Sequence, residues 1–89
     1  MADLRPEIRH VDMPQAMQER AIQVAKDALQ KRVKNNEIGA YIRDRFDTEY
    51  GPAWHCVVGK SFGGSVAYEE QHIIYFKLQN KAFMLYKWG

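Results

Sequence analysis

The first third of the chain repeats apolar residues at intervals of three and four, which is the spacing of an amphipathic helix. Asp12-Met13-Pro14-Gln15 precedes the repeat. We expect Asp12 to cap the helix N-terminus and Pro14 to be tolerated in the first turn. The helix is predicted to run towards Arg32. Its apolar stripe consists of Met17, Ala21, Val24, Ala25, Ala28 and Leu29.

A second helical repeat follows the pair Asn35-Asn36, which interrupts the first repeat and can cap a new helix. Gly51-Pro52 is expected to end this helix, with Gly51 as a left-handed cap and Pro52 unable to continue. The stripe of the second helix consists of Ile38, Tyr41, Ile42 and Phe46.

After Pro52 the period changes to the two-residue alternation of strands. Aromatic and β-branched residues support strands over 53–59, 62–68, 72–78 and 82–87, and residues 7–11 could form another. Two helices followed by a mostly antiparallel sheet make an α+β domain. In the strand over 72–78, one face carries Ile74, Phe76 and Leu78, and the other carries Ile73, Tyr75 and Lys77.

Composition excludes several function classes. The 89 residues predict one domain, 1–89, with a thin core that oligomerisation often completes and little room for a deep cofactor pocket. A net charge of +2 is too weak to favour nucleic acid. The cations Lys31, Arg32 and Lys34 are interpreted as a helix C-terminus, where they suit the dipole, in preference to a phosphate-binding patch.

The cysteine content and the lengths of the apolar runs predict the cellular compartment of the protein. Cys56 is the only cysteine, so no internal disulfide is possible, which fits a reducing compartment. The charged start of the chain lacks the apolar region of a secretory signal, and no apolar run is long enough to span a bilayer. We therefore expect a cytosolic protein without a membrane partner.

The segment Gly59-Lys60-Ser61 resembles the end of a phosphate-binding loop. Such a loop needs a glycine five residues before Gly59, where Trp54 stands, and it opens a helix, whereas both flanks here have the pattern of strands. A hairpin turn is the preferred interpretation.

Other chemical sites are disfavoured by spacing. His55 and Cys56 are neighbours on a strand and would point to opposite faces, so they cannot act together as base and nucleophile. His10, His55 and His72 lack the spacing of metal ligands. We expect no enzyme activity, no cofactor and no metal ion.

The predicted strand over 62–68 contains two consecutive glycines, Gly63 and Gly64. Glycine in a strand often marks the close approach of another backbone. An edge strand with free N–H and C=O groups can accept an added strand. The pattern therefore favours an edge that binds an extended peptide.

A longer motif surrounds these glycines. The pattern His-x-Ile-x-Gly-Lys-x-Phe-Gly-Ser-x-Val-Ser/Thr-His/Tyr-Glu is matched at His55, Gly59, Lys60, Phe62, Gly63, Val66, Tyr68 and Glu69. With the run from Phe46 to Cys56 and the terminal Lys87-x-Gly89, the chain resembles, over its whole length and without gaps, the dynein light chain family in its small homodimeric hub class (type 1/2).

The resemblance implies a homodimer in which two N-terminal helices pack on a mostly antiparallel five-stranded sheet. One strand, over 62–67, would be exchanged between the subunits. The dimer interface implied by the family consists of His55, Val57, Gly59, Lys60, Ser61, Phe62, Val66 and Ala67.

The same resemblance implies a non-catalytic hub that binds short linear motifs by β-strand addition in two symmetric grooves, promoting partner dimerisation and dynein complex assembly. Expected partners are the dynein intermediate chain and disordered proteins with Thr-Gln-Thr-type motifs. The expected localisation is the cytoplasm, in the microtubule-associated dynein complex, or the axoneme. The groove residues carried over from the family are Arg9, His10, Asn35, Asn36, Phe62, Gly63, Gly64, Ser65, Val66, Ala67, Tyr68, Ile73, Tyr75, Lys77, Ala82 and Met84.

Departures from the family pattern support an alternative, a divergent paralogue that acts as a dimerisation hub outside the motor with altered motif specificity. Typical members carry an aromatic residue where Ser65 and Lys77 stand. Trp88 takes the place of a serine proposed as a phosphorylation switch in some members.

His55 lies at the dimer interface in the family, where its protonation would favour monomers. Without the family, plain core would be the preferred interpretation of the Ile73–Tyr75 face.

Overall fold

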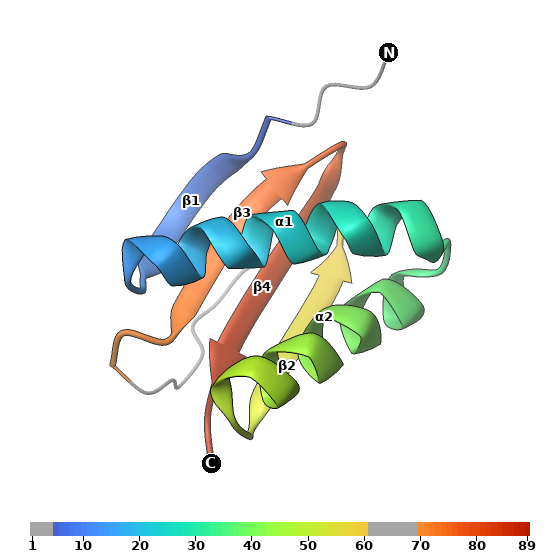
Figure 1. The fold of residues 1–89 in the computed structure, drawn as a ribbon. Helices are drawn as coiled ribbons and strands as arrows, with labels where there is room; N and C mark the ends of the chain where they lie inside the picture. Colours follow the sequence, from blue (N-terminus) through green and yellow to red (C-terminus); the bar gives the residue numbers. More distant parts are fainter. Residues whose placement is uncertain (1–4, 61–69) are drawn as a thin grey trace.

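Two helices lie on one face of an antiparallel sheet in this computed structural model, which describes residues 5–60 and 70–89 (Figure 1). The strand order among these residues is β1-β3-β4-β2, and each neighbouring pair is antiparallel. The predicted α+β class with two helices is confirmed. The elements are β1 (Glu7–Asp12), α1 (Gln15–Lys31), α2 (Asn35–Tyr50), β2 (Trp54–Gly59), β3 (Ile73–Leu78) and β4 (Lys81–Lys87).

Four strand predictions are confirmed to within one residue at each end: those over 7–11, 53–59, 72–78 and 82–87. The described part of the chain contributes four strands to the sheet. The predicted strand over 62–68, and with it the fifth, exchanged strand, lies outside the described residues.

The start of α1 differs from the prediction. Asp12 does not cap the helix, because it still belongs to β1, where it pairs with Ile73. Its carboxylate instead accepts a hydrogen bond from the backbone N–H of Gln71 at 3.1 Å. Pro14 occupies the cap position without a side-chain cap, and its carbonyl accepts the N–H of Gln18 at 3.0 Å.

The ends of α2 also depart from the prediction. Lys34 takes the cap position, so neither asparagine caps the helix, and Asn35 Oδ1 instead accepts a hydrogen bond from Lys81 Nζ at 2.6 Å. At the other end Gly51 has the expected positive φ of 79°, but its ψ of 161° is extended and not left-handed helical. The turn is held by Asp47, whose carboxylate accepts the N–H of Trp54 at 2.8 Å.

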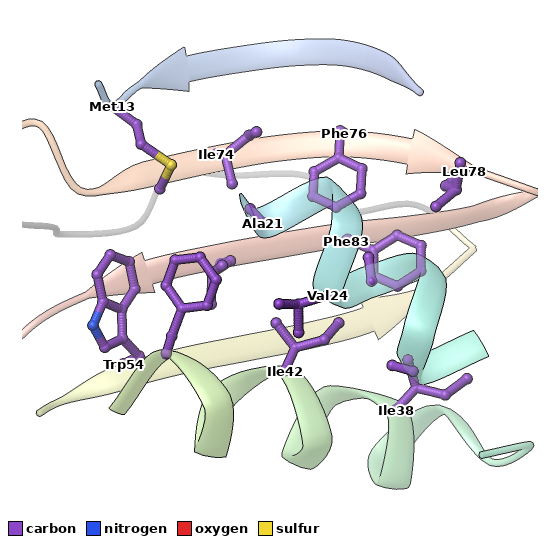
Figure 2. Close-up of a cluster of buried hydrophobic side chains, with 14 residues drawn as sticks. Met13, Ala21, Val24, Ile38, Ile42, Trp54, Ile74, Phe76, Leu78 and Phe83 are labelled. Atoms are coloured by element: carbon purple, nitrogen blue, oxygen red, sulfur yellow. The ribbon is translucent and has the colours of Figure 1, made fainter. Parts of the chain in front are cut away.

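The hydrophobic core lies between the helices and the sheet (Figure 2). Phe46 packs edge-on against Trp54 with ring centres 4.9 Å apart, and Phe76 stacks on Phe83 at 5.0 Å. The predicted helical stripes are largely confirmed, although Met17, Leu29 and Tyr41 are only partly buried. The fully buried large side chains are Trp54, Phe46, Phe76, Phe83, Ile38, Ile42, Ile74, Leu78, Leu85 and Val24.

A glycine lets α2 lie close to β2. A Cβ atom added at Gly39 would stand 3.0 Å from the backbone oxygen of Cys56. Because a strand carbonyl in a sheet has little room to move, Gly39 sets the separation of α2 and β2. The hydrophobic pattern of the sequence gives no indication of this close approach.

Candidate functional site

The second face of the sheet, opposite the helices, brings together residues that the sequence analysis placed in a groove. In the register of β3 and β4, Ile73 opposes Tyr86, Tyr75 opposes Met84 and Lys77 opposes Ala82. Opposed residues of an antiparallel pair share a face, and alternate residues take opposite faces. Since Ile74, Phe76 and Leu78 point towards the helices, these six residues point away from them. We call this side of the sheet the outer face.

Strand β2 extends the outer face. His55 opposes Tyr86, Val57 opposes Met84 and Gly59 opposes Ala82. Val57 is 46% exposed, and β2 is an edge strand of the sheet formed by residues 5–60 and 70–89. Three of the predicted interface residues, His55, Val57 and Gly59, thus lie on one strand beside the predicted groove floor. Lys60 follows them and is exposed.

The outer face is apolar but distinct from the core beneath the helices. Ile73 is 4% exposed and Ala82 is fully buried, yet neither belongs to the cluster that the helices cover. Tyr75, Met84 and Tyr86 are half-buried. Ile73 and Ala82 are thus buried within their own chain but outside the cluster that the helices cover, so both interpretations of the Ile73–Tyr75 face, plain core and groove floor, agree with this burial.

His55 contacts two residues near the C-terminus, Tyr86 and Trp88. Its ring stacks on Tyr86 with centres 5.2 Å apart, and Nε2 lies 3.2 Å from the carbonyl oxygen of Trp88. A carbonyl only accepts, so Nε2 carries the hydrogen. The N–H of Trp88 in turn donates to Ala53 at 3.0 Å.

The first turn of α2 offers backbone donors close to the turn between β3 and β4. The N–H groups of Glu37 and Ile38 both donate to Lys34, at 3.0 and 2.9 Å. The N–H groups of Asn35 and Asn36 have no acceptor among the described residues, as is usual at a helix start. The side-chain bond from Lys81 to Asn35 fixes this turn beside Ala82. Sequence reasoning had no signal for that contact.

Strand β1 forms the other edge of the described sheet. His10 opposes Tyr75, so it lies beside the predicted groove floor, while a bulge between Ile8 and His10 displaces Arg9 from the register. Arg9 pairs with Glu7 at 3.1 Å. The remaining predicted site residues, Ser61, Phe62, Gly63, Gly64, Ser65, Val66, Ala67 and Tyr68, lie outside the described residues.

Cys56 and His55 lie on opposite faces of β2, and the Cys56 thiol is not activated as a nucleophile. The Cys56 side chain packs against the core while His55 belongs to the outer face. Burial raises the pKa of the Cys56 thiol to about 12, which keeps it protonated and un-nucleophilic at neutral pH. In the part of the chain that the structure describes, no three potential metal-ligating side chains gather, and no helix is long and apolar enough to cross a membrane.

The sequence model of the family described as dynein light chain type 1 matches residues 5–88. This chain belongs to the dynein light chain family. It is 44% identical over 84 residues to a protein of Emericella nidulans named "Dynein light chain, cytoplasmic", a match that covers 94% of this chain and 89% of the relative. The predicted family is thereby confirmed.

Solved structures that resemble this member of the dynein light chain family agree with its fold. The dynein light chain-like domain of the calcium binding protein FhCaBP2 from Fasciola hepatica matches with a TM-score of 0.83 at 17% identity, covering 98% of this chain and 94% of that one. The corresponding domain of CsTAL3 matches with a TM-score of 0.77 at 14% identity, covering 92% and 90%. At such identities the likeness is one of fold.

Proposed function

We propose that this member of the dynein light chain family is a non-catalytic, homodimeric hub. It would bind short linear peptide motifs by β-strand addition and so join partner chains in pairs. The observation that carries the proposal is the outer face, where apolar side chains from β2, β3 and β4 lie side by side and neither helix of the described residues covers them. The whole of 1–89 would act as one domain.

The dimer interface is proposed along β2. Within residues 5–60 and 70–89, β2 is an edge strand with an exposed apolar residue, Val57, and such an edge is a template for pairing with another chain. Pairing across a two-fold axis would place His55 and Val57 of both copies against one another. The strand over 62–67 would be the exchanged one.

The peptide groove is proposed over Ile73, Tyr75, Lys77, Ala82 and Met84, with the start of α2 at one end. Backbone pairing would supply affinity, and the pockets between these side chains would supply preference. The open N–H groups of Asn35 and Asn36 would receive a polar side chain such as the glutamine of a Thr-Gln-Thr motif.

The partners proposed on family membership are the dynein intermediate chain and disordered proteins that carry such motifs. The proposed place is the cytoplasm, on microtubule-associated dynein, since the relative from Emericella nidulans is named as cytoplasmic. Two bound motifs per dimer would raise the avidity of a bivalent partner by about 10²–10⁴-fold.

One observation favours a second candidate, a paralogue that acts outside the motor with altered specificity. Lys77 places a half-buried cation on the outer face, directly opposite Ala82. A cation there would favour peptides with an acidic residue at the neighbouring position. Co-purification of the dynein intermediate chain from cell extract supports the motor subunit, and its absence supports the paralogue.

The test of the groove is a calorimetric titration of the full chain with a Thr-Gln-Thr peptide. Asn35→Pro removes one open N–H at a helix position that tolerates proline, and it should weaken binding about tenfold. Asn35→Ala is the matched control, because it removes the same side chain and its bond to Lys81 but keeps the N–H. Equal loss in both variants would contradict recognition by the helix start, and undetectable binding to the parent would contradict this motif preference.

A further inference from the structure

A cluster of cations that the proposed groove does not use lies where the end of α1 meets α2. The charge centres of Lys31, Arg32 and Arg45 lie 5.5, 5.6 and 5.6 Å from the centre of the Tyr41 ring. Lys31 Nζ and Arg45 Nη2 each donate a hydrogen bond to Tyr41 Oη at 3.2 Å. Cations from the end of α1 and the middle of α2 therefore meet at one phenol, and we call these four residues the Tyr41 cluster.

The end of α1 accounts for only part of this arrangement. Arg32 Nη1 donates to the carbonyl of Lys31 at 2.9 Å, as expected for a cation at a helix C-terminus. That interpretation does not explain why Lys31 reaches across to α2, or why Arg45 meets it there. Among the described residues, no acid lies within ion-pair distance of Lys31 or Arg32.

Arg45 is only partly neutralised. Its nearest acid is Glu49, at 3.8 Å, but that carboxylate is already held by Arg20 through hydrogen bonds of 2.6 and 2.7 Å. The Tyr41 cluster therefore has an excess of positive charge. Like charges this close repel one another, and an anion placed among them would relieve that repulsion.

Tyr41 adds a hydrogen-bond donor to the cluster. Its oxygen accepts hydrogen bonds from Arg45 and Lys31, so its own hydrogen remains available to a ligand. The same two bonds, the one from Arg45 first, hold the pKa of Tyr41 below its usual range. A more acidic phenol is a stronger donor to an anion.

An open cavity of about 370 Å³ adjoins the cluster, and Arg32, Tyr41 and Arg45 are among the residues that line it. Two acids, Glu37 and Asp44, line it too. Asp44 is paired with Arg43 at 3.1 Å, which leaves Glu37 as the acid that opposes an anionic ligand. The cavity has room for a group larger than a single phosphate.

We propose that the Tyr41 cluster is a binding site for a phosphomonoester. A tetrahedral dianion can accept hydrogen bonds from two or three cations and a phenol at once, whereas a carboxylate has two oxygens for the same donors. The phosphate can be carried by a phosphorylated protein segment or by a small free molecule. Either source would bind independently of the outer face, since the cluster lies on the side of the helices.

The test is a nitrogen-15 NMR titration of the full chain, at low ionic strength, with inorganic phosphate. The backbone signals of Ala40, Tyr41 and Arg45 are expected to shift. Lys31→Gln should weaken binding about tenfold, the effect of losing one hydrogen bond to a charged group. Tyr41→Phe should weaken it as well, and Glu37→Gln should strengthen it.

The matched control is Lys26→Gln, which removes the same charge from the same helix away from Tyr41. Equal weakening by Lys26→Gln and Lys31→Gln, or shifts spread over all cationic residues, would overturn the proposal in favour of diffuse attraction. A phosphoserine peptide and its unphosphorylated twin distinguish the sources. Tighter binding of the phosphopeptide than of inorganic phosphate assigns the site to a phosphorylated protein segment, and weaker binding assigns it to a small phosphorylated molecule.

Discussion

The two faces of the sheet carry similar residues, but they have different neighbours. On one face, Ile74 and Phe76 are buried beneath α1 and α2 (Figure 2). On the outer face, Val57 is almost half exposed and Met84 half-buried, with no helix of the described chain over them. A small chain cannot cover both faces of its sheet with two helices. The covered face then supplies folding stability, and under the proposed function the outer face is the one that a partner would stabilise.

The largest effect is expected on the covered face. Phe46 is fully buried and packs against Trp54, so Phe46→Ala should lower the free energy of unfolding by about 3–5 kcal/mol. Chemical denaturation at one fixed protein concentration measures this loss, because the stability of the proposed dimer would depend on concentration. Phe46→Leu is the control that keeps most of the volume, and it should cost clearly less. A loss below about 1 kcal/mol for Phe46→Ala would contradict the assignment of this face as the core.

A smaller effect is expected where the covered face meets β2. Gly39→Val would press a branched side chain against the carbonyl of Cys56, which should cost about 1–3 kcal/mol. Gly39→Ala already places its Cβ 3.0 Å from that carbonyl oxygen, so its contact cost is offset by the about 1 kcal/mol by which alanine favours the helix, whereas valine adds two further carbons to the same contact. The two variants should therefore differ in denaturation midpoint. Equal stability of parent and Gly39→Val would show that the approach of α2 to β2 is not tight.

The smallest effect is expected at an ion pair remote from both faces. Hydrogen bonds from Arg20 hold the pKa of Glu49 below its usual range. The pair thus contributes stability above the unfolded pKa of Glu49 and loses it as the pH falls through the lower, folded pKa. Since both side chains are about one-third exposed, the contribution should be less than about 1 kcal/mol.

Denaturation of the parent and of Glu49→Gln at several pH values measures this contribution. The difference between the two proteins should be present at neutral pH, shrink as Glu49 becomes protonated, and fall with added salt. A difference that is constant from neutral to acidic pH would exclude the ion pair as its cause.

The sequence predicts the covered face well, for a physical reason. Burial beneath a helix imposes a period of 3.6 on the helix and of two on the strand, and both periods are visible at Val24, Ile42 and Phe76. It predicts helix starts poorly. Asp12 has the side chain of a cap, yet strand pairing with Ile73 and the bond from Gln71 retain it in β1.

The outer face is harder to interpret from the sequence alone. Alternation shows that Ile73 and Tyr75 share a face, but an apolar strand face is more often covered by its own chain. The family resemblance, and not the pattern, predicted a groove there. Contacts between side chains distant in sequence, such as Lys81 with Asn35 or Lys31 with Tyr41, leave no periodic signal at all.

The proposed dimer interface along β2 is tested by sedimentation equilibrium of Val57→Lys beside Gln23→Lys. Val57 lies on the proposed interface, whereas Gln23 lies exposed on α1, where a lysine can still bond to Asp27. Both variants add one positive charge at an exposed position. We expect Val57→Lys to sediment as a monomer and Gln23→Lys as a dimer, with both chains folded. If Val57→Lys remains as dimeric as Gln23→Lys, the outer edge along β2 is not where this protein joins its copy.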